Sequence, residues 1–210
     1  MFTGLIEHVG RVEGLHPIGG GYRLSLETPV AGDLRDGDSI AVNGVCLTVV
    51  GRVDRRFVTE IGPETARVTT LGDLRPGALV NLERPMRPDG RMGGHFVLGH
   101  VDCKGVLRAI RADGEFWWIT IGFDPGLAPY FIPKGSVAVD GISLTVATLR
   151  EAEFDVQIIP FTWEHTNLQA SRPGDGVNLE VDVIGKYVVR VAQLAGMWPA
   201  GGRAPLAPPS

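Results

Sequence analysis

Two short segments of the chain carry the same pattern of potentially reactive side chains, 97 residues apart. Residues 43–49 read NGVCLTV and residues 140–146 read DGISLTV, so Cys46 and Ser143 occupy the same position in the pattern. A thiol or a hydroxyl can add to an electrophilic carbon when a neighbouring base takes its proton. Either segment alone is also a common hairpin turn built on Asn-Gly or Asp-Gly. Because both occur in register, we favour a functional interpretation.

Two histidines could supply the base. The segment 93–102 reads GGHFVLGHVD and contains His95 and His100. Histidine is the side chain whose ordinary pKa lies nearest neutrality, which suits proton transfer. A spacing of five residues puts the two side chains on opposite faces of a strand, and no third ligand accompanies them, so we expect no metal site. A glycine-rich linker that enters the second half of the chain is the alternative interpretation.

The repetition extends well beyond these segments. At the same offset, RPG at 75–77 matches RPG at 172–174, and VNLE at 80–83 matches VNLE at 177–180. Two copies of about 100 residues predict two similar domains and not a solenoid, whose units run to about 20–50 residues. Two similar pockets in one chain suit a protein that holds two similar molecules.

The elements that must position these residues are mostly strands. Apolar and polar residues alternate in 22–27 and 154–158, as in half-buried strands, and Gly and Pro turn signals separate the other candidates. Those candidates are residues 39–42, 47–53, 56–61, 79–84, 116–122, 136–139, 144–149 and 176–183. About six short strands in each half favour a closed barrel, because closure removes exposed edges. The fold class we expect is therefore all-β.

Only a few stretches have a helical pattern. Residues 64–71 and 162–170 are equivalent in the repeat and could each form one or two turns. Residues 186–195 form an amphipathic helix, which packs either on its own chain or against the same helix of another subunit; we expect the second. The expected organisation is a first barrel at 1–94, a second barrel at 95–184, an assembly helix at 185–196 and a disordered tail at 197–210.

Composition narrows the possible partners. A net charge of -4 without a dense basic run argues against nucleic acid and against an anionic membrane surface. No apolar stretch approaches the roughly 20 residues of a spanning helix, and the first dozen residues do not form a signal-peptide core. We therefore expect a cytoplasmic protein with a small-molecule ligand. The two cysteines, Cys46 and Cys103, support neither a disulfide framework nor a zinc site.

Several of these segments together resemble the riboflavin synthase alpha-chain family. The similarity rests on MFTGLIE at 1–7, on the segments 43–49, 93–102 and 140–146, and on VNLEVD at 177–182 followed by KYV at 186–188, and it spans residues 1–194. The resemblance implies two six-stranded Greek-key barrels and a C-terminal helix that assembles three subunits. It also implies a reaction in which two molecules of 6,7-dimethyl-8-ribityllumazine dismutate to riboflavin and 5-amino-6-(D-ribitylamino)uracil. No cofactor is expected, and an association with lumazine synthase is left open.

The resemblance also suggests roles for individual residues. His100 and His95 are candidates for proton transfer from the acidic C7 methyl group of one lumazine, and Cys46 and Ser143 for nucleophilic addition at C7 of the other, with Thr145 assisting. Which group serves which lumazine stays open. The residues expected to bind substrate are Gly4, Leu5, Ile6, Ser39, Cys46, Leu47, Thr48, Glu60, Ile61, Gly62, Pro63, Glu64, Thr65, Gly99, His100, Val101, Lys134, Ile142, Ser143, Leu144, Ile158, Ile159, Pro160, Phe161, Thr162, Trp163 and Asp182.

Two other classes of protein could carry a similar sequence. A non-catalytic relative that carries a lumazine or flavin as a fluorophore would be expected to lose site residues from one half. This chain keeps the site residues of both halves, namely Cys46, His95, His100, Asp140, Ser143 and Lys134. A flavin-binding barrel of a reductase would need a nucleotide-binding domain with a glycine-rich βα turn. The sequence has no such segment, so the enzyme is the favoured interpretation.

Overall fold

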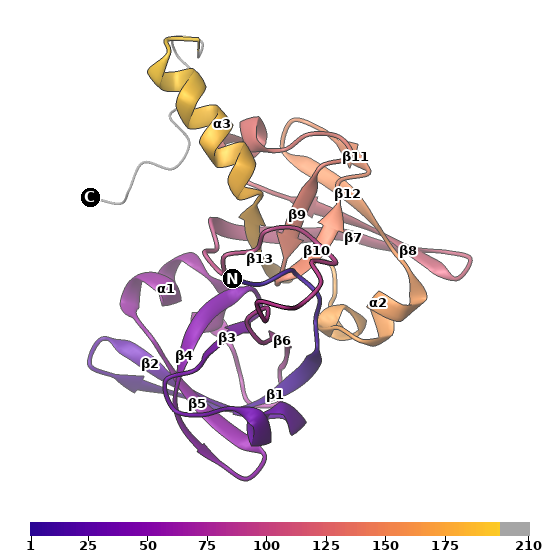
Figure 1. Ribbon diagram of the computed structural model, residues 1–210. Coiled ribbons are helices and arrows are strands. Elements are labelled where there is room, and N and C mark those ends of the chain that lie inside the picture. The colour runs from indigo at the N-terminus through magenta and orange to yellow at the C-terminus, as the bar shows by residue number, and fades with distance from the viewer. Residues whose placement is uncertain (198–210) are drawn as a thin grey trace.

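The first half of the chain forms a closed six-stranded barrel in the computed structural model, which describes residues 1–197 (Figure 1). The barrel has the strand order β1-β2-β5-β4-β3-β6, and all its neighbouring strands are antiparallel. In β2, Leu24 and Leu26 are buried and Arg23 is exposed, as the alternation predicted. The strands are β1 (His8–Ile18), β2 (Gly21–Glu27), β3 (Ser39–Val42), β4 (Val45–Val53), β5 (Arg56–Ile61) and β6 (Leu79–Glu83).

The second half repeats this order with one strand interrupted. Its sheet runs β10-β9-β13-β7-β8-β12-β11, in which β10 and β11 together take the place of β4. The register of β4 already shifts between Val49 and Gly51, and the equivalent residues 146–147 separate β10 from β11. The duplicated all-β fold is thus confirmed, and the second sheet has seven strands because this bulge divides one of them. The strands are β7 (Cys103–Asp113), β8 (Phe116–Gly122), β9 (Ser136–Val139), β10 (Ile142–Thr145), β11 (Thr148–Leu149), β12 (Glu153–Ile158) and β13 (Gly176–Val181).

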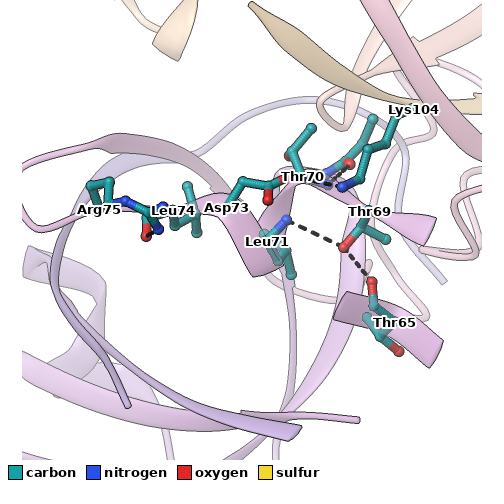
Figure 2. Close-up of polar contacts among 9 residues, drawn as sticks. Thr65, Thr69, Thr70, Leu71, Asp73, Leu74, Arg75 and Lys104 are labelled. Atoms are coloured by element: carbon teal, nitrogen blue, oxygen red, sulfur yellow. Dashed lines mark hydrogen bonds and ion pairs between the residues drawn. The ribbon is translucent and has the colours of Figure 1, made fainter. Parts of the chain in front are cut away.

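Each predicted short helix is divided in two by a threonine. The stretch 64–71 becomes α1 (Pro63–Val68) and the 3-10 turn η2 (Thr70–Asp73), and 162–170 becomes α2 (Pro160–Glu164) and η4 (Asn167–Ala170). The Thr69 hydroxyl donates to the Thr65 carbonyl at 2.6 Å and accepts from the Leu71 amide at 3.3 Å (Figure 2). Thr166 does the same in the second half. The hydroxyl caps the second turn and so ends the first.

Each sheet encloses its own apolar core. The first core contains Leu24, Phe57 and Leu82, and the second contains Ile121 and Phe154. A smaller cluster of Phe2, Ala41, Val97 and Ala138 lies apart from both. The 3-10 turns η1 (Pro29–Asp33) and η3 (Pro125–Tyr130) add Val30 and Leu127 to the first and second core, respectively.

Helix α3 (Val183–Leu194) projects from the second sheet (Figure 1). It begins three residues before the predicted start at 186, because the Asp182 carboxylate accepts from the Ile184 amide at 2.9 Å and caps the first turn. Lys186 forms an ion pair with Asp102 at 2.7 Å. The apolar residues exposed along the helix are Ile184, Tyr187, Val188, Val191 and Leu194. Of the predicted tail, only Met197 lies within the described residues, and no helix among those residues is both long and apolar enough to span a bilayer.

A buried polar network joins the two halves. Asn43 and Asp140 both adopt left-handed backbone angles, and their side chains accept from the Asn81 and Asn178 amides at 2.7 and 2.8 Å. The Asn81 side chain donates to the Asp140 carbonyl, and the Asn178 side chain donates to the Asn43 carbonyl. Each loop is therefore bound by both sheets. An ion pair between Lys104 and Asp73 also links the halves (Figure 2).

One hydrogen-bonded pair of this network, Asp140 and Asn167, has no matching pair in the first half. Asp140 Oδ2 accepts from Asn167 Nδ2 at 2.9 Å, whereas the equivalent positions in the first half are Asn43 and Thr70. Burial raises the pKa of Asp140 from its ordinary 3.8 to about 6, against the hydrogen bonds from Asn178 and Asn167. Because the folded-state pKa is raised, folding favours the protonated carboxyl. This contribution to stability is complete below pH 3.8 and is lost as pH rises through about 6.

Replacing Asp140 and Asn167 by the residues found at the equivalent positions of the first half, asparagine and threonine, tests this asymmetry. Asp140→Asn alone points an amide at the donor of Asn167, so we expect the double variant Asp140→Asn/Asn167→Thr to be more stable than this single variant by about 1–3 kcal/mol. Both variants should show a smaller fall in unfolding free energy between pH 4 and pH 6 than the parent protein. Urea unfolding across this pH range measures both effects. A double variant less stable than Asp140→Asn would contradict the expectation.

Candidate functional site

Each half of the chain begins with a short entry segment that contacts the other half. The first entry segment is residues 2–4, and the second is residues 97–100. The Gly4 carbonyl accepts from the Ser143 amide of β10 at 2.8 Å, and the Gly99 carbonyl accepts from the Cys46 amide of β4 at 2.9 Å. Between these crossings, Phe2 and Val97 pair with each other through their backbones. The amino terminus therefore lies between the two sheets (Figure 1). The two crossings define two sites, a first site at Cys46 and a second site at Ser143.

The first site is built on the first barrel. Cys46 and Thr48 lie on β4, where Thr48 pairs with Ser39 of β3. The predicted residues 60–65 lie at the junction of β5 with α1, on the strand next to β4, and residues 99–101 arrive from the second half. Cys46 is a free, partly exposed thiol, and the His100 side chain is exposed. Glu60 is engaged in an ion pair with Arg23, and Glu64 in one with Arg67.

In the second site, His95 is hydrogen-bonded to the hydroxyl group of Ser143. His95 Nδ1 lies 2.7 Å from Ser143 Oγ, and the His95 amide donates to the Thr3 carbonyl at 3.2 Å. His95 is 8 % exposed, and its Nε2 is buried with no hydrogen-bond partner among the described residues. Burial lowers the pKa of His95 below its ordinary value, although the nearby Asp182 acts in the opposite direction. A neutral imidazole at pH 7 can accept the proton of Ser143.

The two histidines thus belong to different sites. The sequence presents His95 and His100 as a pair, but the structure brings His95 to Ser143 and leaves His100 beside Gly99, which contacts Cys46. Cys46 and Ser143 therefore lie in different chemical environments. The buried imidazole of His95 contacts Ser143, whereas among the described residues no hydrogen bond joins Cys46 to a histidine.

The remaining predicted residues of the second site come from several elements. Ile142, Leu144 and Thr145 lie on β10, residues 158–163 lie where β12 meets α2, and residues 4–6 come from the first half. Trp163 stacks on Trp117 with ring centroids 4.5 Å apart, and Phe161 is 66 % exposed. Ile158, like Ile61 of the first site, points into its core.

Ser136 lies at the second site but is not among the residues that the sequence predicts there. Ser136 pairs with Thr145 across β9 and β10, as Ser39 pairs with Thr48 in the first site. The signal that could have identified it is the offset of 97 residues from Ser39. Ser136 and Asp182 line an apolar cavity of about 270 Å³ between η3 and the start of α3. A larger groove of about 490 Å³ between the two halves, beside Thr70 and Lys104, contains none of the predicted catalytic residues.

Lys134 has a strained backbone next to the second site. Its φ is 66°, and its amide donates to the Val146 carbonyl at 2.7 Å; the equivalent residue in the first half is Gly37, with φ 92° and the same bond to Val49. The left-handed region costs a residue with a side chain roughly 1–2 kcal/mol. A lysine in this strained conformation is the reason we keep the prediction that its exposed ammonium group takes part in ligand binding.

We expect Lys134→Gly to stabilise the protein and to weaken ligand binding. Relief of strain, offset by the flexibility of glycine in the unfolded chain, should raise the unfolding free energy by up to about 1 kcal/mol. Loss of the ammonium should weaken binding at the second site only. Urea unfolding and fluorescence titration with a ribityl-bearing ligand measure the two effects, with Lys104→Gln as the control for lost charge. Unchanged affinity would remove Lys134 from the site.

Comparison with known proteins shows the same duplication. The family model described as the lumazine binding domain matches residues 3–85 and again residues 98–182. The chain is 46% identical over 202 residues to a protein named riboflavin synthase from Mycobacterium tuberculosis strain H37Rv, covering 93% of this chain and 100% of that one. It is 41% identical over 191 residues to riboflavin synthase from Bacillus subtilis strain 168, covering 90% of this chain and 89% of that one.

A solved structure shares the fold at lower sequence identity. LumP complexed with riboflavin superposes with a TM-score of 0.80 at 21% identity, covering 86% of this chain and 99% of that one. This likeness concerns the fold alone. The two matches to the domain model and the identity over nearly the whole chain show that this protein belongs to the riboflavin synthase family of lumazine-binding-domain proteins.

Proposed function

We infer that this protein is a riboflavin synthase, a transferase that dismutates two molecules of 6,7-dimethyl-8-ribityllumazine. One molecule transfers a four-carbon unit to the other, which becomes riboflavin, and the donor becomes 5-amino-6-(D-ribitylamino)uracil. The observation that carries this conclusion is the pair of equivalent sites with different reactive groups, Cys46 in one and Ser143 with His95 in the other. A reaction between two identical heterocycles needs two pockets of similar shape and different chemical roles.

The second site is suited to nucleophilic activation. In our proposal Nδ1 of the neutral His95 imidazole accepts the proton of Ser143 as the hydroxyl oxygen adds to C7 of the lumazine bound there. One C–O bond forms, the π bond at C7 of the lumazine opens, and its electron pair moves into the ring system. The first site, with Cys46 and the exposed His100, then receives the lumazine whose C7 methyl group loses a proton. Holding the two rings in register contributes to the rate, since well-oriented reactants gain roughly 7–11 kcal/mol over free collision.

We propose that three copies of the chain assemble through α3. The support is the run of exposed apolar residues on this helix, from Ile184 to Leu194, with Tyr187 and Leu194 each 72 % exposed. The apolar cavity at the base of α3 lies beside Asp182, next to the second site. Packing of another subunit against α3 would cover this cavity, which is open in the single chain. In the trimer that we propose, the first site of one subunit faces the second site of its neighbour.

We also propose a cytoplasmic location. The described cysteines Cys46 and Cys103 are both free thiols, which suits a reducing compartment. Association with lumazine synthase stays a prediction, and co-purification of the two proteins would test it.

Incubation of the purified protein with 6,7-dimethyl-8-ribityllumazine and no added cofactor tests the function. We expect one riboflavin and one uracil product for every two lumazines consumed. Tight binding without product would instead identify a non-catalytic lumazine-binding protein. Absorbance of riboflavin with chromatographic detection of the uracil measures both products in one experiment.

A further inference from the structure

We infer that Glu83 and Glu180 are positioning residues, each of which holds the entry segment that completes the site on the opposite sheet. The inference rests on the proposed function for its effect on turnover, and on the geometry alone for its effect on the two sites. Both residues lie at the same position of the repeat, Glu83 at the end of β6 and Glu180 in β13. They are 5 % and 2 % exposed.

Glu83 binds the first entry segment with both carboxylate oxygens. Its Oε1 accepts from the Thr3 amide at 2.7 Å and from the Thr3 hydroxyl at 3.0 Å. The Gly4 amide donates to both oxygens, at 3.2 and 3.0 Å. The carboxylate therefore fixes two consecutive residues of a segment that belongs to neither sheet.

Glu180 binds the second entry segment in the same way. Its Oε1 accepts from the Leu98 amide at 2.7 Å, and its Oε2 accepts from the Gly99 and His100 amides at 3.0 Å each. Three consecutive backbone donors thus converge on one side chain. One of these three donors is the backbone amide of His100, whose side chain is a candidate for proton transfer.

Neither carboxylate forms an ion pair among residues 1–197. Burial raises the pKa of both groups, and the backbone donors of the entry segments oppose this rise. At Glu180 the charge of Lys186 opposes it as well, and the charge of Asp102 adds to it. An unpaired buried carboxylate is unfavourable unless hydrogen bonds replace its hydration. Here the hydrogen bonds come from the entry segments, so the segments and the carboxylates stabilise one another.

Each carboxylate acts on the site of the other half. Glu83 belongs to the first barrel, but the Gly4 that it holds contacts Ser143, and the Thr3 that it holds accepts from the His95 amide. Glu180 belongs to the second sheet, but the Gly99 that it holds contacts Cys46.

At both crossings the backbone lies too close to the opposite sheet to leave room for a side chain. Gly4 and Gly99 have φ of 77° and 80°, and a Cβ atom on either would lie 2.6 Å from the Cβ of Ser143 or 2.5 Å from that of Cys46. A displaced segment would therefore displace the reactive groups directly. A misplacement of about 1 Å in an active site can cost about 100-fold in rate.

The isosteric variants Glu83→Gln and Glu180→Gln test the inference in the full chain. Each places an amide donor against backbone donors, and we expect each to lower kcat by at least about tenfold. Alkylation of Cys46 by iodoacetamide in the unliganded protein distinguishes the two sites. Glu180→Gln should change its rate by more than about threefold, whereas Glu83→Gln should leave it unchanged. Peptide mapping separates Cys46 from Cys103, whose pKa burial raises to about 11.

The exposed Glu27→Gln serves as the control for a lost carboxylate and should match the parent protein. Thr3→Val removes one donor and keeps Glu83, so it should lower kcat in a folded protein even where Glu83→Gln unfolds. Equal changes of Cys46 alkylation in both glutamine variants, or unchanged kcat in folded variants, would overturn the inference. If the parent protein turns over no lumazine, the proposed function fails. The difference in Cys46 alkylation rate between Glu180→Gln and Glu83→Gln would still test whether each glutamate positions the entry segment at the opposite site.

Discussion

Replacing Ser143 with alanine is expected to lower kcat by about 100-fold or more while leaving lumazine binding largely intact. His95 Nδ1 makes a short contact with Ser143 Oγ; His95 is buried, and Ser143 is partly exposed where it meets the first entry segment. A positioned acid or base contributes about 10²–10⁴-fold to a rate, and the alanine variant removes the group on which His95 acts. Steady-state kinetics and a fluorescence titration separate the effect on turnover from the effect on affinity.

The matched change in the first site should have a different size. Cys46→Ala removes a thiol that has no hydrogen-bonded histidine among the described residues, so we expect a smaller loss of kcat than in Ser143→Ala. Cys103→Ala removes the other free thiol, which lies in β7 outside both sites, and should retain the turnover of the parent protein. Turnover equal to the parent in both Ser143→Ala and Cys46→Ala would refute the proposed roles.

The same pair predicts the pH dependence of turnover. Burial lowers the pKa of His95, so the imidazole stays neutral to a pH below the ordinary histidine value of about 6.5. Activity that requires this base should therefore persist to mildly acidic pH and fall as His95 becomes protonated below that value. The acidic limb should be lost in Ser143→Ala. A limb that is unchanged in this variant would assign it to another group.

Introducing charge on the exposed face of α3 is expected to abolish turnover by separating the subunits. Val191 and Leu194 are 61 % and 72 % exposed in the single chain, so Val191→Glu/Leu194→Glu should leave the barrels folded. If the reaction joins the first site of one subunit to the second site of another, separated subunits lose the orientation that is worth roughly 7–11 kcal/mol. Size-exclusion chromatography with light scattering measures the assembly, and product formation measures the loss.

Two controls make this prediction specific. Arg190→Glu introduces a negative charge on the same turn outside the apolar stripe and should preserve both assembly and turnover. Mixing Ser143→Ala subunits with Cys46→Ala subunits should restore part of the activity, because one intact site of each kind can then meet across an interface. A fully active monomer of the charged variant would show that one chain contains the whole reaction centre.

Much of the fold could be predicted because its signals are local. Strand alternation in β2 and β12, and the Gly and Pro turns between strands, depend on neighbouring residues only, and the offset of 97 residues then relates the two halves. The boundaries were less predictable where side chains compete with the backbone. Thr69 and Thr166 each end a helical stretch by capping the next turn, and Asp182 begins α3 three residues early.

The composition of each site depended on contacts between residues distant in the sequence. Glu83 reaches Thr3 across 80 residues, and Asn178 reaches Asn43 across 135. No periodicity or spacing predicts such bonds, because they form between segments that meet only after both sheets have folded. The assignment of His95 to Ser143, 48 residues away, is of the same kind.

The sequence by itself determined the duplication, the all-β class and the equivalence of Cys46 and Ser143, since repeated local patterns encode repeated local structure. The tertiary structure alone decided that each entry segment crosses to the opposite sheet, and that, within residues 1–197, Ser143 is hydrogen-bonded to a buried histidine whereas Cys46 is not. The physical reason is that buried backbone donors must find acceptors wherever the packed chain provides them, and here those acceptors are the Glu83 and Glu180 carboxylates.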